Sequence, residues 1–139
     1  MEKGIYAVAG LYVSAMAVMD IKKREIPVIP GVVCAMGIAI CRLCGDRGWQ
    51  SWIPGMGIGL MLWCVSRLSR GGIGEGDALV YAVLGLVLGF FGTMEVLMIS
   101  LALAAFAGII MMLWHRVGRQ YAMPFVPFTA LAYAVVVCL

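Results

Sequence analysis

Charged residues are scarce in this chain, at 12% of 139 residues, and histidine occurs only once. Soluble domains carry about 25% charged residues, so the composition excludes an ordinary soluble protein. The net charge of +3 is spread over several short segments rather than gathered in one basic patch, which argues against nucleic acid as a partner. The hydrophobic content of 64% and the mean hydropathy of +1.05 predict an integral membrane protein of the all-α class.

Several catalytic and metal-binding patterns are also missing. The sequence has neither the Gly-x-Ser-x-Gly pattern of serine hydrolases nor the His-Glu-x-x-His pattern of zinc proteases. Cys41 and Cys44 form a single Cys-x-x-Cys pair, whereas a structural zinc site takes four ligands. We therefore expect no metal and no cofactor, and the sequence leaves the role of this cysteine pair open.

Apolar segments occupy most of the chain and predict a bundle of six transmembrane helices in one domain, 1–139. A spanning helix needs about 20 predominantly apolar residues, which leaves no room for a separate soluble domain. The expected helices are approximately 4–19, 26–44, 52–68, 77–91, 94–114 and 124–139. Gly92 and Thr93 are expected to form the turn between the fourth helix and the fifth.

Lysine and arginine are distributed unequally between alternate loops. One side holds Lys22, Lys23, Arg24, Arg67, Arg70, Arg116 and Arg119, and the other holds Lys3, Arg42 and Arg47. The side richer in lysine and arginine is expected to face the cytoplasm, which predicts that both termini are extracytoplasmic. On this orientation Asp20, at the end of the first helix, and Asp77, at the start of the fourth, both lie at the cytoplasmic face.

Two carboxylates at one membrane depth suggest acid-base chemistry. Carboxylates that share a site cannot both ionise cheaply, so one pKa rises and the pair holds a proton between them. Such a pair can activate a water molecule against a peptide carbonyl. Gly74 and Gly76, on either side of Glu75, leave the backbone free to take positive φ, and we expect them to admit an extended substrate.

Pairs of small residues four positions apart indicate close helix packing. Gly55 and Gly59, Gly85 and Gly89, and Ala104 and Gly108 each have this spacing. Helices in lipid associate through packing rather than through hydrophobic burial, so these pairs favour a compact bundle.

Other interpretations of the aspartates stay open. Each could cap a helix end or pair with a nearby cation such as Lys22 or Arg70. A proton- or cation-coupled transporter could use the same two carboxylates, because acidic residues within membranes also mark ion pathways. A purely structural membrane protein would leave the glycine and proline motifs without a role.

Three motifs resemble the type IV prepilin peptidase family. Residues 20–27, Asp-Ile-Lys-Lys-Arg-Glu-Ile-Pro, are similar to the family segment in which Ile-Pro-Asn follows an aspartate. Residues 74–77, Gly-Glu-Gly-Asp, are similar to the Gly-x-Gly-Asp motif of a class of intramembrane aspartyl proteases. Residues 124–128, Pro-Phe-Val-Pro-Phe, resemble a third family segment. The three occur in family order over nearly the whole chain.

The resemblance implies a multi-pass protease of the cytoplasmic (inner) membrane that cleaves the leader peptide of type IV prepilins or pseudopilins. Cleavage is expected at the cytoplasmic face, after a glycine that precedes the hydrophobic pilin helix. Asp20 and Asp77 would be the catalytic pair, and the expected partners are the leader peptide and membrane lipid. The candidate substrate-binding residues are Gly74, Glu75, Gly76, Pro124, Phe125 and Pro127.

The chain departs from the family pattern in three ways. Val28 stands in place of the asparagine after Ile-Pro, and Leu79 stands where many members have lysine. Larger relatives carry a cytosolic insertion with two Cys-x-x-Cys pairs for zinc and are associated with methylation of the pilin N-terminus. We therefore expect a short peptidase without that insertion. The sequence leaves open methylation, the identity of the prepilin, the oligomeric state and whether the aspartates meet without substrate.

Overall fold

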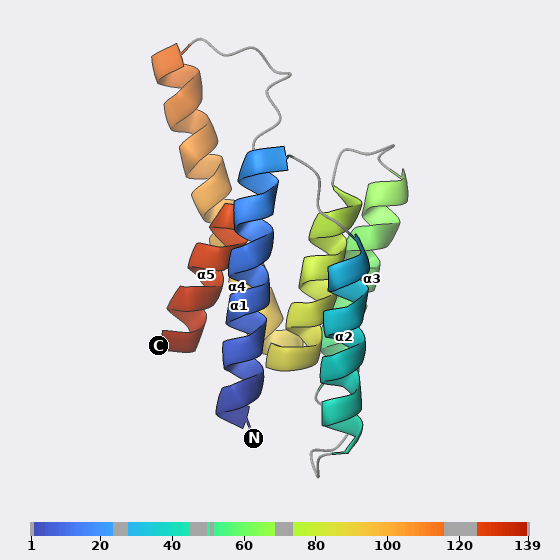
Figure 1. Ribbon diagram of the computed structural model, residues 1–139. Helices are drawn as coiled ribbons and strands as arrows, with labels where there is room; N and C mark the ends of the chain where they lie inside the picture. Colours follow the sequence, from blue (N-terminus) through green and yellow to red (C-terminus); the bar gives the residue numbers. More distant parts are fainter. Residues whose placement is uncertain are drawn as a thin grey trace.

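The computed structural model describes residues 2–23, 28–44, 50, 52–68, 74–115 and 125–138. These residues are all-helical, in agreement with the predicted class. They form the five helices α1 (Glu2–Lys23), α2 (Val28–Leu43), α3 (Ile53–Leu68), α4 (Glu75–His115) and α5 (Val126–Cys138). The helices lie roughly side by side, and the two chain ends lie toward the same end of the bundle (Figure 1).

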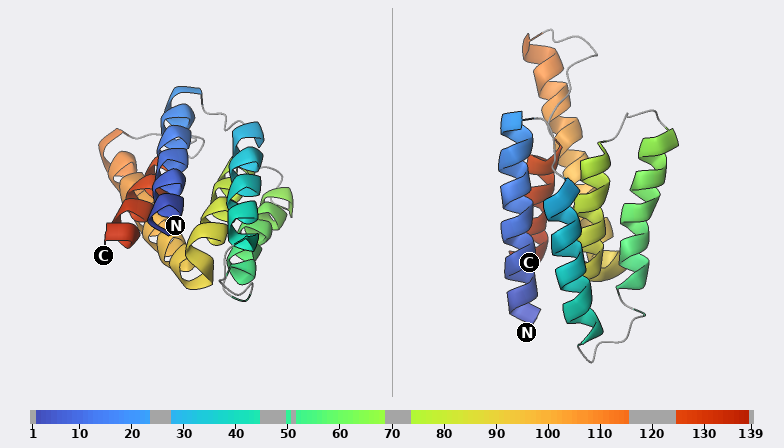
Figure 2. Two further views of the ribbon diagram at one scale, coloured as in Figure 1. Left: turned by 60° about the horizontal axis from the view of Figure 1, so that its bottom comes forward. Right: turned by 45° about the vertical axis from the view of Figure 1, so that its right-hand side comes forward.

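Helix α4 is bent back on itself at Gly89, so it supplies two rods of the bundle rather than one. Gly89 has φ 73° and ψ −171°, a conformation that is essentially confined to glycine. Both views of Figure 2 show the chain running to one end of the bundle and returning beside itself. The Thr93 hydroxyl donates a hydrogen bond of 2.6 Å to the Gly89 carbonyl and so ties the first turn of the returning rod to the kink.

The expected turn at Gly92 and Thr93 was therefore placed a few residues too late. The reversal occurs at Gly89, whose backbone angles only glycine adopts without strain, whereas Gly92 continues the helix. Glu95 consequently lies beyond the first turn of the returning segment, where a favourable interaction with the helix dipole fades.

Replacing Gly89 by alanine should destabilise the protein by about 1–3 kcal/mol, the usual cost of a residue held in such a region. Gly108→Ala is the matched control on the same helix, because a Cβ built at Gly108 meets no heavy atom within 4 Å among the described residues. Thermal unfolding of the purified variants measures both changes. Equal melting temperatures for the two variants would contradict the assigned strain at Gly89.

Two helix boundaries differ from their expected positions near the aspartates. Helix α1 continues through Asp20 to Lys23, so Asp20 lies in the last helical turn rather than at its end. Helix α4 begins at Glu75 instead of Asp77, because the Gly74 carbonyl accepts hydrogen bonds from the Asp77 and Ala78 amides. The expected start of the second helix at Ile26 and the start of the last helix at Pro124 lie outside the described residues.

Small residues bring α3 against the first rod of α4. A Cβ added at Gly59 would lie 2.5 Å from the Ala82 backbone, and one added at Gly55 would lie 2.7 Å from the Gly89 carbonyl carbon. The expected roles of Gly55, Gly59 and Gly85 in helix packing are thereby confirmed. The Ala104 and Gly108 pair has no such role, since the space beside Gly108 is open among the described residues.

Apolar length is sufficient for membrane crossing in two helical segments, Gly4–Lys22 and Glu75–Trp114. The remaining described helices, α2, α3 and α5, are apolar but shorter. Because Gly89 folds α4 back on itself, the described residues form six rods. Their correspondence to six membrane crossings, with both termini outside, stays a prediction.

Candidate active site

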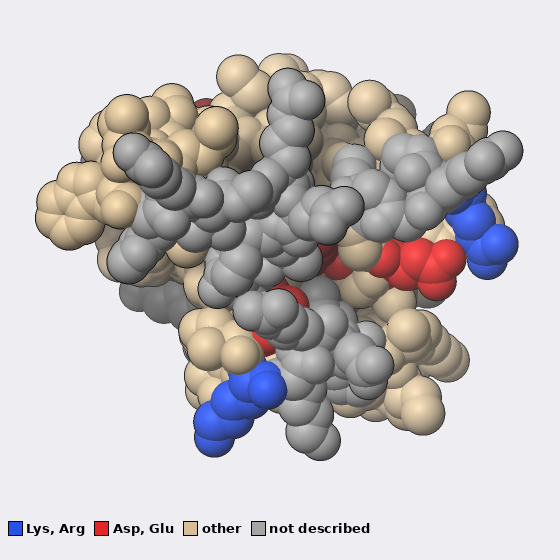
Figure 3. Space-filling view, turned by 90° about the horizontal axis from the view of Figure 1, so that it is seen from above, with Lys and Arg blue, Asp and Glu red and all other residues tan. Residues whose placement is uncertain are grey.

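Asp20 and Asp77 lie at the same end of the bundle, as the alternation of helices predicted. Asp20 comes from the last turn of α1 and Asp77 from the first turn of α4. The two carboxyl groups interact electrostatically. Figure 3 looks onto this end, where acidic atoms lie near the middle and lysine and arginine side chains lie toward the edge.

Asp20 is only 8% exposed, and the structure shows what holds it. Its Oδ2 accepts a hydrogen bond of 3.3 Å from the Val126 backbone amide, the first residue of α5. The amides at a helix N-terminus lack intrahelical partners and point toward an anion, so α5 offers a ready site for this carboxylate. Three helix ends, from α1, α4 and α5, therefore meet at the pair.

Asp77 is half-buried, and its carboxylate lies close to Gly74, the residue that precedes its own helix. A Cβ built at Gly74 would lie 3.3 Å from Asp77 Oδ2, so a side chain there would crowd the carboxylate. Gly76 is buried within the first turn of α4. Gly74 and Gly76 do not use the freedom of glycine to take positive φ, since among the described glycines Gly89 is the one that adopts it. Helical pairing onto the Gly74 carbonyl fixes this segment in ordinary helix geometry instead.

Glu75 is separate from the aspartate pair in its interactions. Its carboxylate forms an ion pair with Arg67 Nε at 3.3 Å, and the Glu75 side chain is 57% exposed. The guanidinium of Arg67 also lies 5.2 Å from the ring centroid of Trp63. Glu75 thus links the start of α4 to the end of α3, and exposed pairs of this kind contribute little to stability.

A polar cluster below the aspartates was missed from the sequence. Tyr81, one turn beyond Asp77, is almost fully buried, and its hydroxyl lies 2.5 Å from Ser100 Oγ and 3.2 Å from Thr129 Oγ1. These contacts join the two rods of α4 to α5. Isolated hydroxyl residues inside apolar segments were the available signal, because buried polar groups need hydrogen-bond partners.

Phe125, directly before α5, packs beside the Tyr81 cluster. The Phe125 ring centroid lies 6.3 Å from that of Tyr81, and the Phe125 carbonyl accepts a hydrogen bond from the Phe128 amide. Pro127 lies in the first turn of α5, where proline is tolerated. Pro124, the remaining member of the expected substrate-binding set, lies outside the described residues.

Cys41 and Cys44 are exposed free thiols at the end of α2. Within the described ranges, three or more histidine, cysteine or acidic side chains do not gather anywhere into a possible metal site. His115, which directly follows the helix expected at 94–114, is the last residue of α4.

Comparison with models of known protein families shows which family the chain belongs to. Residues 7–113 match the model of the type IV leader peptidase family. The chain belongs to the type IV leader peptidase family. The matched range contains both Asp20 and Asp77 and stops short of the segment at residues 124–128. No significant match was found among curated proteins or among solved structures.

Family membership makes the chain a protease of the leader-peptidase type with a peptide substrate. The family and the apolar helices together indicate a membrane protein. The transporter alternative, which rested on the carboxylates alone, gains no support from this match.

Proposed function

We propose that this leader peptidase is a membrane aspartic endopeptidase that cleaves type IV prepilins or pseudopilins with Asp20 and Asp77. The observation that carries the proposal is that two aspartates from separate helices, in the last turn of α1 and the first turn of α4, lie at one end of the bundle (Figure 1). Both groups lie within the residues matched by the family. An acid and a base side by side are what peptide hydrolysis through an activated water requires.

The proposed reaction uses one proton shared by the pair. The ionised carboxyl takes a proton from water as the water oxygen attacks the peptide carbonyl, and the protonated carboxyl donates its proton to the carbonyl oxygen. Collapse of the tetrahedral species breaks the C–N bond, and the leaving nitrogen receives the proton that was taken from water. The products are the leader with a new carboxylate and the pilin with a new amino terminus.

The position of the site suits a substrate that enters from the cytoplasmic side of the inner membrane. Exposed cations, Lys22 and Arg67, lie at the same end as the aspartates. A surplus of positive charge favours the cytoplasmic side, so we place the active site there and both termini outside. The Glu75 carboxylate is exposed but paired with Arg67, so a basic leader would compete with that arginine for it. We keep Glu75 as a substrate-binding candidate with Gly74, Phe125 and Pro127.

The substrate assignment is tested with a synthetic peptide that has a basic leader, one glycine and an apolar helix. Purified protein in lipid vesicles should cut it once, after the glycine, and mass spectrometry of the products identifies the bond. Replacing that glycine by valine adds three carbon atoms and should slow cleavage by at least about 10- to 200-fold, the range that one misfitting methylene group produces.

A peptide of the same composition with the leader and helix in scrambled order is the control. Cleavage at another bond, or equal rates for the glycine and valine peptides, would contradict the prepilin assignment. Ion flux that depends on both aspartates, without cleavage of any peptide, would favour a transporter instead.

A further inference from the structure

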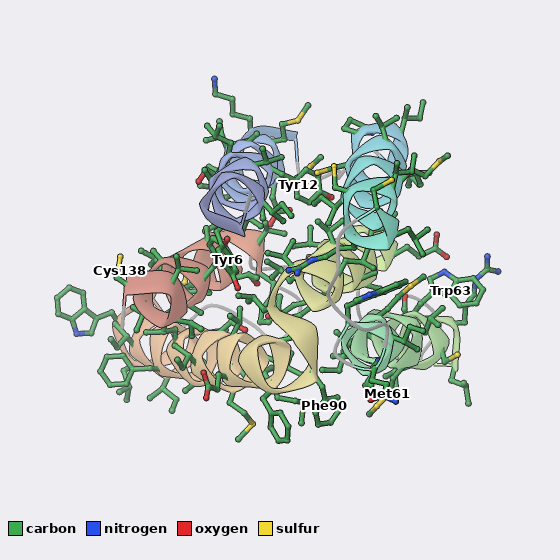
Figure 4. All side chains as sticks on the ribbon, turned by 90° about the horizontal axis from the view of Figure 1, so that it is seen from below. Tyr6, Tyr12, Met61, Trp63, Phe90 and Cys138 are labelled. Carbon is green, nitrogen blue, oxygen red and sulfur yellow. The ribbon has the colours of Figure 1, made fainter. Side chains whose placement is uncertain are left out.

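A pocket lies at the opposite end of the bundle from Asp20 and Asp77. It has a volume of about 400 Å³ and lies between the beginning of α1, the end of α2, the beginning of α3 and the kink in α4. Its described lining consists of Tyr6, Arg42, Gln50, Trp52, Pro54, Val87, Leu88, Gly89, Phe90 and Phe91. Figure 4 views the molecule from this end and labels Tyr6 and Phe90. The leader-peptidase chemistry leaves this pocket without a role.

Arg42 places a buried positive charge in the pocket. The residue is only 8% exposed, and its Nη2 donates a hydrogen bond of 2.5 Å to the Val87 carbonyl. The kink at Gly89 leaves carbonyls of the preceding turn without regular helical partners, so a cation there complements the end of the first rod. This contact accounts for one guanidinium nitrogen.

Two donors in the same pocket remain unused. Arg42 Nε and Trp52 Nε1 are buried, and neither has a hydrogen-bond partner among the described residues. Because a buried N–H without an acceptor is unfavourable, both groups call for an acceptor that this part of the chain does not supply. Gln50 adds an amide group, and the described lining contains no carboxylate to neutralise Arg42.

The remaining lining is apolar and reaches the outside of the molecule. Phe91 is 82% exposed and packs edge-to-face with Phe90, their ring centroids 5.6 Å apart. A phenylalanine ring has no polar atom, so exposed rings of this kind suit an apolar surrounding such as lipid acyl chains. The pocket therefore combines a buried cation and unused N–H donors with an apolar rim.

We propose that the Arg42 pocket binds a phosphate group carried by a membrane phospholipid. Arginine suits phosphate because its planar guanidinium offers several N–H donors together with a permanent charge. Arg42 Nε and Trp52 Nε1 donate to the phosphate oxygens, and the acyl chains lie along Phe90 and Phe91. This site is independent of the aspartate pair and of the proposed peptidase reaction.

The test measures ligand-dependent melting of the full chain purified in detergent. The three probes are short-chain phosphatidylglycerol, inorganic phosphate, and a diacylglycerol with the same acyl chains. Wild-type protein should be stabilised by phosphatidylglycerol, since a ligand that binds the folded state raises its melting temperature with concentration. Arg42→Gln should weaken the apparent affinity by about tenfold or more, as expected for loss of a hydrogen bond to a charged group.

Trp52→Phe removes the second donor while keeping an aromatic ring, and it should weaken binding by about tenfold, the lower end for loss of one hydrogen bond to a charged acceptor. If Arg42→Gln does not fold, the affinity of Trp52→Phe for phosphatidylglycerol tests whether the pocket binds phosphate. Arg67→Gln is the matched control, because it removes an exposed arginine beside a tryptophan at the other end of the bundle. It should leave the affinity for phosphatidylglycerol unchanged.

Each outcome has a fixed meaning. Stabilisation by phosphatidylglycerol alone supports a lipid source, and equal stabilisation by inorganic phosphate with the same dependence on Arg42 or Trp52 supports a free phosphate. Equal stabilisation by diacylglycerol overturns the proposal. Unchanged affinity in Trp52→Phe and Arg42→Gln, or an equal loss in Arg67→Gln, overturns it as well.

Discussion

Asp77→Asn and Asp20→Asn should each abolish peptide cleavage while leaving the bundle folded. Loss of a positioned acid or base lowers the rate by about 10²- to 10⁴-fold, and neither asparagine can exchange the required proton. The measurement is the initial rate of leader cleavage by purified protein, with intact and cleaved peptide separated by mass. Either variant at wild-type rate would show that the aspartate pair does not perform the chemistry.

Stability measurements separate a catalytic role from a structural one for these aspartates. Asp20 and Asp77 lie at the same end of the bundle, and two carboxyls that share a site cannot both ionise cheaply, so a neutral amide in either place removes this cost. We therefore expect melting temperatures equal to or above that of the wild type. A large fall in melting temperature would instead indicate that the residues act by capping α4 or α5.

Glu95→Gln is the matched control for removal of a carboxylate. Glu95 is exposed on the returning rod of α4, away from the aspartate pair. Its replacement should change neither the cleavage rate nor the melting temperature. The double variant with Asp20→Asn and Asp77→Asn should be no slower than the poorer single variant, because residues that act as a unit are not additive.

Gly55→Ala should unfold or strongly destabilise the protein, with a cost at or above the upper end of the usual 1–3 kcal/mol for overpacking, about 3 kcal/mol. The added Cβ would lie 2.7 Å from the Gly89 carbonyl carbon and would also meet the Gly85 carbonyl oxygen. Both are backbone atoms and cannot rotate away. The methyl group therefore forces α3 away from the first rod of α4.

Gly57→Ala is the matched control for this change. Gly57 lies two residues further along α3, and a Cβ built there meets no heavy atom within 4 Å among the described residues. Alanine favours a helix over glycine by up to about 1 kcal/mol, so this variant should be neutral or slightly stabilised. Thermal unfolding in detergent compares the two variants, and similar melting temperatures would show that α3 and α4 are not packed through Gly55.

The sequence by itself was sufficient for the class of protein and for the family. Apolar segments of spanning length predicted an all-helical chain, because helices satisfy every backbone group internally in lipid. The alternation of these segments placed Asp20 and Asp77 at one end of the bundle. Glycines four residues apart marked the packing of α3 on α4, since a missing side chain at a helix surface is visible in the sequence.

Local details near glycine were less predictable. The reversal in α4 was expected at Gly92 but occurs at Gly89, because several glycines in one apolar segment are equivalent until packing selects one. Gly74 and Gly76 left the backbone free to take positive φ, yet hydrogen bonds onto the Gly74 carbonyl start a regular helix there. A glycine can adopt many backbone conformations, and the packing and hydrogen bonds of its neighbours select one of them.

Only the tertiary structure decided which groups meet. The Val126 amide reaches Asp20, Tyr81 joins Ser100 to Thr129, and Arg42 reaches the Val87 carbonyl, all between segments far apart in the chain. Such pairs depend on how helices are rotated and shifted against one another, which is set by side-chain packing across several interfaces at once. The sequence thus determined the apolar helices and the placement of the two aspartates at one end of the bundle. Packing determined the partners of Asp20 and the buried cation at the opposite end.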